Sequence, residues 1–456
     1  MSQHVSRAAT LMVVCTAHFL MPFMMSAVGV ALPSIGRDFN ASAMQLGLVE
    51  TTYVLSASIF LLAMGRMGDI HGRRKVFQYG IVAFTLAGGL LSQAWSIESM
   101  IVMRFVQGMG GSMVMATTFA IVVSVFPPEE RGKALGIAVA SVYAGISCGP
   151  FIGGALVTAF GWRSIFYIAV PLGAIIFATS CAKLRGEWAE SRGEPFDWRG
   201  SLVYAAAILM LITGASNLDQ GVWAWVLTMA GTAGLVHFLV LESRTEYPVL
   251  NVNLLRDNRV FAFSNLAALL NYAATFGVTF FLSLYLQFVK GLNPREAGTI
   301  LILQPIIQAV FSPLCGRLAD RFSAATVATV GMGLCATGLG IAATISATSP
   351  ITLVLGTLVT LGFGFALFSS PNISVIMGSI PTRYLGVASG LNSTMRTLGM
   401  MASMTVITII FSVFMGGQAI TPQTHGQFLD SMRTALLTFS VLCIIGIFFS
   451  LGRIRQ

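Results

Sequence analysis

Glu50 and Arg104 are two ionisable residues that stand inside long apolar segments, where a charge is costly and is a candidate for function. Glu50 lies near the start of the apolar segment 46–64, with Tyr53 about one helical turn further on. Arg104 lies near the start of the segment 99–125. If the two segments are neighbouring helices, the two charges could meet, and a carboxyl group there could carry a proton. Alternatively, Glu50 reaches up to the lipid headgroups, and Arg104 holds backbone carbonyls.

His18 lies near the middle of the first apolar segment, before Pro22. A histidine there could relay protons, or it could be neutral and bonded to a neighbouring helix. The residues that we expect to bind or transfer protons are therefore Glu50 and His18, with Arg104 as the charge beside Glu50.

Small polar residues recur at helical spacing inside other apolar segments. They either line a substrate pocket, with methionine as an adaptable apolar contact, or hold membrane helices together. In the pocket interpretation, the lining residues are Tyr53, Gln107, Met24, Gln304, Gln308, Asn392 and Arg396.

A glycine-rich stretch occupies residues 136–154. Gly145, Gly149 and Gly153 recur every four residues and share one helix face, which lets another helix approach closely. Pro150 removes a backbone donor and predicts a kink. Such a face suits two helix bundles that must seal against each other and then part, although ordinary small-residue packing is the alternative. The residues assigned to this stretch are Gly136, Gly145, Gly149, Pro150, Gly153 and Gly154.

The composition indicates a polytopic membrane protein whose surroundings are the lipid bilayer. Of 456 residues, 55% are hydrophobic and 9% charged, against roughly 25% charged in soluble domains. Most of the 26 lysine and arginine residues fall on one side if the N-terminus is cytoplasmic, so we expect both termini to be cytoplasmic in a cell membrane. This distribution accounts for the net charge of +9 without nucleic acid.

Apolar segments separated by polar breaks predict about fourteen spans in an all-α fold. Their approximate limits are 9–32, 46–64, 76–94, 99–125, 134–158, 164–182, 200–216, 223–241, 260–287, 298–315, 323–344, 350–378, 386–414 and 434–452. The six cysteines fall in or beside apolar segments without paired spacing, so we expect neither a disulfide framework nor a metal site. We expect no cofactor, and the absence of a nucleophile–base pair argues against an enzyme.

An internal repeat divides the chain into two related halves. The sequence from Gly65 to Asp69 (GRMGD) recurs as GRLAD, which ends at Asp320. Both copies follow the second span of a half, and we expect both to lie in polar loops. An extra helix pair separates the halves. The expected divisions are 1–182 (a six-helix bundle), 183–258 (linkers with the extra pair) and 259–456 (a second six-helix bundle).

Several motifs resemble the major facilitator superfamily, specifically its fourteen-helix drug:proton antiporter branch. GRMGDIHGRRK at 65–75, MRFVQGMGG at 103–111, the stretch 136–154, GWRSIFYIAVPLG at 161–173 and LNVNLLRDNRVF at 250–261 match in order. The resemblance implies a major facilitator fold and proton transfer through Arg104. It also implies that Asp69, Arg73 and Asp320 clamp the inner ends of the halves. One departure lies in the first span, where Met24 and Gly29 replace the acid and the asparagine typical of the branch.

These observations predict a proton-coupled exporter of small lipophilic compounds that works by alternating access. Two buried arginines against one acid favour neutral or anionic substrates over permanent cations. The alternative is a transporter of one specific metabolite, for export or uptake. We expect a monomer.

Overall fold

The computed structural model describes residues 6–416 and 420–454. Within these ranges, fourteen helical spans are long and apolar enough to cross a membrane, which confirms the all-α architecture expected from the sequence. The first half and the extra pair comprise α1 (Arg7–Phe39), α2 (Ala43–His71), α3 (Arg73–Ser92), α4 (Ile97–Val125), α5 (Arg131–Phe160), α6 (Arg163–Lys183), α7 (Trp198–Ala215) and α8 (Val222–Glu242).

The remaining helices begin with the short α9 (Asn253–Asp257), and α11 and α12 together make one span. They are α10 (Arg259–Leu284), α11 (Pro294–Leu301), α12 (Leu303–Arg321), α13 (Ala324–Ala342), α14 (Ile351–Gly378), α15 (Leu385–Met415) and α16 (His425–Gly452). Short helical turns are η1 (Pro128–Glu130), η2 (Leu218–Gln220), η3 (Tyr285–Val289) and η4 (Thr382–Tyr384).

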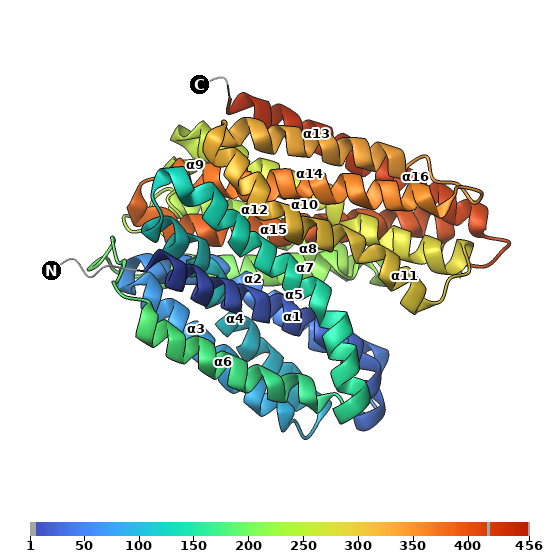
Figure 1. The fold of residues 1–456 in the computed structure, drawn as a ribbon, viewed down its shortest axis with the longest axis horizontal. Helices are drawn as coiled ribbons and strands as arrows, with labels where there is room; N and C mark the ends of the chain where they lie inside the picture. Colours follow the sequence, from blue (N-terminus) through green and yellow to red (C-terminus); the bar gives the residue numbers. More distant parts are fainter. Residues whose placement is uncertain (1–5, 417–419, 455–456) are drawn as a thin grey trace.

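The helices before and after the extra pair form two groups that lie one above the other in Figure 1. Between the groups, α5 packs on α12 and α2 packs on α15. Helix α1 begins and α16 ends at the left end of the molecule (Figure 1). We call this the Asp69 end, because Asp69 and Asp320 lie there.

Two helices continue beyond the apolar segments that predicted them. Helix α2 runs to His71 and α3 begins at Arg73, so only Gly72 separates them. Asp69 therefore lies on a helix, and so does Asp320 in α12. The expectation that both stand in loops was wrong, because backbone hydrogen bonding continues after the side chains become polar.

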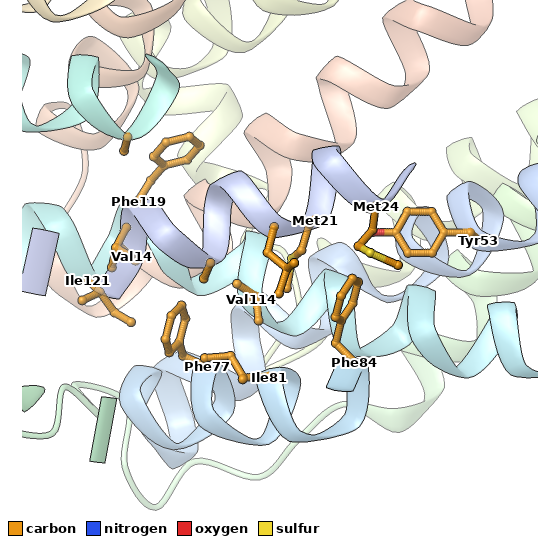
Figure 2. Close-up of a cluster of buried hydrophobic side chains, with 14 of the residues drawn as sticks. Val14, Met21, Met24, Tyr53, Phe77, Ile81, Phe84, Val114, Phe119 and Ile121 are labelled. Atoms are coloured by element: carbon orange, nitrogen blue, oxygen red, sulfur yellow. The ribbon is translucent and has the colours of Figure 1, made fainter. Parts of the chain in front are cut away.

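Each half has its own apolar core. In the first half, α1, α3 and α4 contribute Met21, Phe77 and Val114, each at most 4% exposed (Figure 2). In the second half, Phe281, Phe428 and Phe439 are fully buried among α10 and α16. Lipid tails are as apolar as phenylalanine, so close packing of these side chains, more than their removal from water, holds the helices together. The first core also takes in Ile373 of α14 and Leu391 of α15, so it continues across the contact between the halves.

The extra pair α7–α8 lies beside the contact between α2 and α15. The Tyr204 hydroxyl of α7 lies 3.3 Å from the Ser58 carbonyl of α2, to which it donates, and 3.2 Å from the Thr394 hydroxyl of α15. One tyrosine thus touches both halves.

The glycine face of α5 packs on α1 in its own half. A Cβ on Gly145 would lie 2.4 Å from the Phe19 carbonyl oxygen, and one on Gly153 would lie 2.7 Å from the Ala27 Cβ. The expectation that this face seals the halves was therefore wrong for Gly145, Gly149 and Gly153. Small-residue spacing shows that a helix approaches closely but does not show which helix.

Replacing Gly149 by alanine is expected to destabilise the protein. Its Cβ would lie 2.6 Å from the Ser26 Cβ, and overpacking of this kind costs about 1–3 kcal/mol. Gly154→Ala is the matched control, because its Cβ would meet nothing nearer than 3.8 Å. Thermal unfolding of the detergent-solubilised variants measures the difference. Equal midpoints for the two variants would contradict the packing described here.

Candidate functional site: a two-fold helix clamp and a buried polar interior

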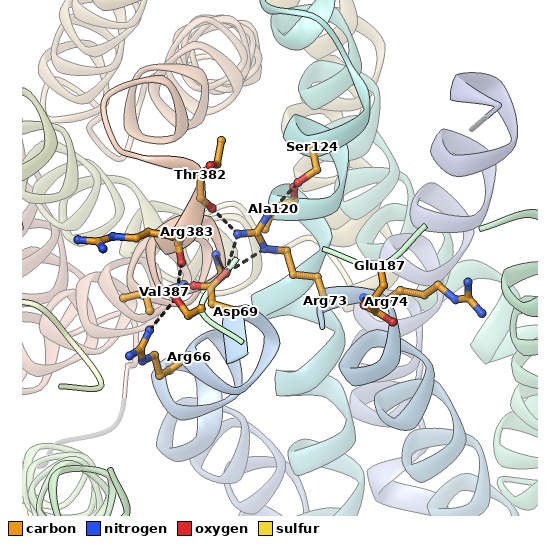
Figure 3. A network of polar contacts seen from close by, with 12 residues as sticks. Arg66, Asp69, Arg73, Arg74, Ala120, Ser124, Glu187, Thr382, Arg383 and Val387 are labelled. Carbon is orange, nitrogen blue, oxygen red and sulfur yellow. Dashed lines mark hydrogen bonds and ion pairs between the residues drawn. The ribbon is translucent and has the colours of Figure 1, made fainter. Parts of the chain in front are cut away.

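Asp69 joins the two halves through the first turn of α15. Its carboxylate accepts hydrogen bonds from the backbone N–H groups of Gly386 and Val387, each at 2.9 Å. It also accepts from Arg73 at 2.7 Å, and both side chains are at most 1% exposed (Figure 3). Helix N-termini present unpaired N–H groups and a positive dipole end, so a buried carboxylate is well stabilised there.

Arg73 extends this contact. Its guanidinium donates to the Thr382 carbonyl in the second half at 2.5 Å and to the Ser124 hydroxyl of α4 at 2.9 Å. Arg73 therefore neutralises Asp69 and bridges the halves itself (Figure 3).

Asp320 repeats the arrangement with the halves exchanged. It accepts from the backbone N–H groups of Gly132 at 2.6 Å and Lys133 at 2.8 Å, in the first turn of α5. Each aspartate thus caps the start of a helix in the opposite half. We call the two contacts the crossed caps.

Glycines bring the backbones together at the crossed caps. A Cβ on Gly65 would lie 2.3 Å from the Gly386 carbonyl oxygen, and one on Gly316 would lie 2.1 Å from that of Gly132. One turn further in, a Cβ on Gly136 would lie 2.5 Å from the Ser312 carbonyl oxygen. Gly136 is thus the glycine assigned to the 136–154 stretch that faces the other half, and a larger residue here would force the halves apart.

The sequence analysis missed the partner glycines. A Cβ on Gly390 would lie 2.6 Å from the Leu61 carbonyl oxygen. Gly390 follows Gly386 by four residues, the same spacing that separates Gly136 from Gly132. This repeated Gly-x-x-x-Gly pair at the start of the fifth helix of each half was a usable signal.

Arg104 lies fully buried between α4 and α2. It donates to the Val49 carbonyl at 3.0 Å and to Gln107 Oε1 at 2.7 Å, and its guanidinium carbon lies 4.5 Å from the centre of the Tyr53 ring. The Arg104 Nη2 and Gln107 Nε2 atoms have no hydrogen-bond partner among the described residues. The cluster thus keeps unpaired donors in a buried position, where an unsatisfied polar group is costly.

Glu50 is half-buried and faces α1. Its Oε1 lies 3.3 Å from the position that a Cβ would take on Gly29, so the missing side chain of Gly29 leaves room for the carboxyl group. Glu50 and Arg104 are close enough to interact electrostatically, yet the ion pairs of the described residues do not join them. The two charges lie near each other without direct contact.

His18 packs between helices. It is 4% exposed, meets the Phe119 ring edge-on at 5.1 Å and faces the Ala138 backbone. It also lies within the electrostatic reach of Arg396.

Arg396 lies where the halves meet and is partly exposed. Its Nη2 lies 4.0 Å from the Met115 sulfur, and Tyr53 and Tyr143 are within its electrostatic reach. Tyr143 of α5 contacts Phe365 of α14 at 5.8 Å between ring centres.

Tyr272 completes this aromatic group. Its ring lies 5.1 Å from that of Phe365, which also contacts Tyr143, and its side chain lies within electrostatic reach of Tyr143 in the other half. The sequence analysis missed Tyr143, Tyr272 and Phe365. A tyrosine in the middle of a span, away from the interfaces that tyrosine prefers, was the available signal.

The other residues expected to line a pocket are buried between helices. Gln304, Gln308 and Asn392 are 8%, 4% and 5% exposed, and Gln304 Oε1 has no partner among the described residues. Met24 is 1% exposed and belongs to the core of the first half, beside Tyr53 (Figure 2). In this conformation Met24 is a core residue, because α1 turns it toward its own bundle.

Fourteen spans in two halves that meet at interlocking helix ends define a membrane transporter, not an enzyme. The family model of the Major Facilitator Superfamily matches residues 14–404, so the chain belongs to this superfamily. The fourteen spans agree with its fourteen-helix branch, as the motifs indicated.

Three comparisons illustrate this relationship. The chain is 30% identical to the riboflavin transporter RibZ of Clostridioides difficile (strain 630), covering 98% of this chain and 97% of that protein. It is 31% identical to the multidrug resistance protein Stp of Mycobacterium tuberculosis, and the match covers 85% of this chain and 73% of that protein. The crystal structure of the human organic anion transporter MFSD10 shares the fold at 14% identity, with a TM-score of 0.71 over 97% of this chain and 99% of that one.

Asp69→Asn is expected to loosen the Asp69 end. The substitution leaves Arg73 buried without a counter-charge, and breaking a buried pair in this way costs about 3–5 kcal/mol. Cys315, 7% exposed beside the contact between Gly316 and Gly132, serves as the reporter in a background without the other cysteines. Its maleimide labelling should accelerate at least about tenfold, since 1.4 kcal/mol already corresponds to a factor of ten.

Glu190→Gln is the control for this labelling experiment, because Glu190 is an exposed carboxylate in the segment between α6 and α7. Its labelling rate should equal that of the unmodified protein. A protected Cys315 in Asp69→Asn would contradict a role for the crossed caps in closing this end.

Proposed function

We propose that the protein is a proton-coupled exporter of small lipophilic compounds that works by alternating access. In this proposal it is a monomer in the cell membrane, and its Asp69 end and both termini face the cytoplasm. Residues 1–182 and 259–456 act as two moving bundles, and 183–258 link them. The described conformation is then the one closed toward the cytoplasm.

The crossed caps are the observation that carries the proposal. Asp69 and Asp320 each hold the first turn of a helix in the opposite half through two backbone donors. Such contacts are strong when dry and are replaced by water when the halves part, so they suit a gate that opens repeatedly. Gly65 opposite Gly386 and Gly132 opposite Gly316 let the halves close without side chains between them.

Glu50 is the proposed proton carrier, with Arg104 as its electrostatic partner. Protonation of Glu50 removes the charge that balances Arg104, whose remaining contacts are a carbonyl, an amide and an aromatic ring. This change acts on the packing of α4 against α2, and α2 also carries Asp69. His18 of α1 is a further candidate for proton transfer, because it faces α5 and lies within the electrostatic reach of Arg396.

The substrate is proposed to lie where Arg396, Tyr143 and Tyr272 meet across the halves. Aromatic rings suit a planar lipophilic compound, and an arginine without an acidic partner favours a neutral or anionic one. The proposal for export draws on the similarity to a multidrug resistance protein.

A second candidate is a transporter of one specific metabolite. The similarity to a riboflavin transporter covers nearly the whole of both chains, which favours this alternative. Purified protein in proteoliposomes with an imposed pH gradient separates the two. Gradient-driven movement of several unrelated lipophilic compounds supports the exporter, whereas movement of one metabolite alone supports the alternative.

Glu50→Gln is expected to abolish transport driven by the pH gradient while leaving substrate exchange at equal pH. The amide keeps the shape of the side chain but cannot release a proton. Glu98→Gln is the control, because Glu98 is an exposed carboxylate in the first turn of α4. Unimpaired gradient-driven transport by Glu50→Gln would remove Glu50 from the coupling mechanism.

Arg396→Gln is expected to change charge preference more than overall rate. Loss of the cation should lower transport of anionic compounds at least about tenfold and leave neutral compounds within about twofold, as expected when a charged hydrogen bond is lost. Equal losses for both classes would indicate that Arg396 supports the structure instead of the substrate. Competition between matched neutral and anionic compounds in the same vesicles measures this preference.

A further inference from the structure

Two carboxyl groups face each other at the base of the extra helix pair. Asp197 precedes the first residue of α7, and Glu242 is the last residue of α8. Glu242 is 2% exposed. Neither residue is among those assigned above to the gate or to substrate binding.

Each carboxyl group uses one oxygen on a backbone donor. Asp197 Oδ1 accepts from the Gly200 N–H at 2.8 Å, and Glu242 Oε2 accepts from the Leu250 N–H at 2.7 Å. These bonds fix the orientation of both groups. They leave Asp197 Oδ2 and Glu242 Oε1 without a donor among the described residues, although both oxygens are buried.

Gly200 brings the two free oxygens together. A Cβ at this position would lie 2.0 Å from Glu242 Oε1 and 2.5 Å from Asp197 Oδ2, so both oxygens converge on the space that a side chain would fill. The two side chains lie within hydrogen-bonding reach of each other. Two buried carboxylates at this range repel, and neither could donate to the other.

A proton satisfies both oxygens at once. A protonated carboxyl group gains one O–H donor, and an O–H to carboxylate hydrogen bond is short and strong. A metal ion fits poorly, because Ca²⁺ takes six to eight oxygen ligands and this site offers two free ones. In the described part of the chain, no group of three or more His, Cys, Asp or Glu residues is placed to hold a metal.

We infer that Asp197 and Glu242 form a proton-binding site in which one carboxylic acid donates to the other carboxylate. The proton exchanges with solvent at the Asp69 end and need not cross the membrane. The site stands apart from the proposed function, since neither group contacts Glu50, Arg104 or Arg396 among the contacts of the described residues.

The charged residues on the neighbouring segments are exposed and do not balance the two carboxyl groups. On α7, α8 and the segment that follows it, Arg199, Arg244 and Glu246 are exposed. Asp197 is the charged group that acts on Glu242, and the segment after α8 turns only the backbone of Val249 and Leu250 toward it. An added proton is therefore the available means of balancing the pair.

The site joins the extra helix pair to the crossed caps. Asp197 ends the linker 184–197, and within this linker Ser191 donates from its backbone to the Asp69 carbonyl at 3.0 Å. Glu194 of the same linker pairs with Arg66, which is buried. On the other side, Leu250 leads toward α9 and α10. Loss of the proton would release both segments that Asp197 and Glu242 hold.

Stability as a function of pH tests the inference in the purified full-length protein. The folded state holds a proton that an unfolded carboxylate releases, so stability falls as pH rises. Between about pH 6 and about pH 9, the range in which buried carboxylic acids lose their protons, the unfolding midpoint should fall by at least about 2 °C. Glu242→Gln supplies a permanent N–H donor to Asp197 and should remove this fall.

Infrared spectroscopy gives a direct readout of the same site. The carbonyl stretch of a protonated carboxylic acid, which shifts on deuteration, should be present near neutral pH and lost in Glu242→Gln. Glu246→Gln is the matched control, because it removes an exposed carboxylate four residues away and should leave both the band and the pH profile unchanged.

Two results would overturn the proton site. One is a Glu242→Gln protein that keeps the pH profile and the infrared band of the unmodified protein. The other is recovery of the midpoint at high pH on adding Na⁺ or K⁺, which would assign the site to a metal cation. If Glu242→Gln does not fold, Asp197→Asn provides the same test, because asparagine also caps helices and also carries an N–H donor.

Discussion

The contact of a buried carboxylate with the first turn of a helix in the opposite half is the interaction on which the rest of the structure depends. Asp69 and Asp320 make this contact in opposite directions, and each needs two converging N–H groups that only a helix start provides. Glycines must then line the approach, since any side chain would separate the donors from the acceptor. The repeat found in the sequence is thus explained by the geometry of one contact made twice.

The number and order of spans could be predicted because apolar length is encoded locally. Their ends could not, since α2 continues through Asp69 after its side chains become polar. The small residues on one face of α5 predicted that another helix packs closely against it. Which helix does so, α1 at Gly145 and α12 at Gly136, depends on the tertiary arrangement. The contact of Tyr143 with Tyr272 is equally invisible in sequence, because it joins helices from different halves.

The polar groups of the interior differ in how their charges are balanced. Arg73 has a carboxylate partner, whereas Arg104 relies on a carbonyl, an amide oxygen and the face of Tyr53. Among the described residues, Arg453, 4% exposed at the end of α16, donates to neutral oxygens, including those of Asn372 and Ser264. A pair made with a carboxylate can be broken by one proton. Arg453, held by neutral groups, keeps its contacts over the whole physiological range and suits a fixed position, whereas Arg104 also lies within the electrostatic reach of Glu50.

The partners of Asp69 and Asp320 are main-chain groups, and this has a consequence for how the protein can diverge. Nearly every amino acid carries the same N–H group, so Val387 and Lys133 can change identity without loss of the contact, whereas Gly386 and Gly132 have no room for a side chain. Proline is excluded at all four positions, because it has no hydrogen to donate. Two aspartates can therefore persist in a lineage while only one of the two positions opposite each of them shows a trace of its role.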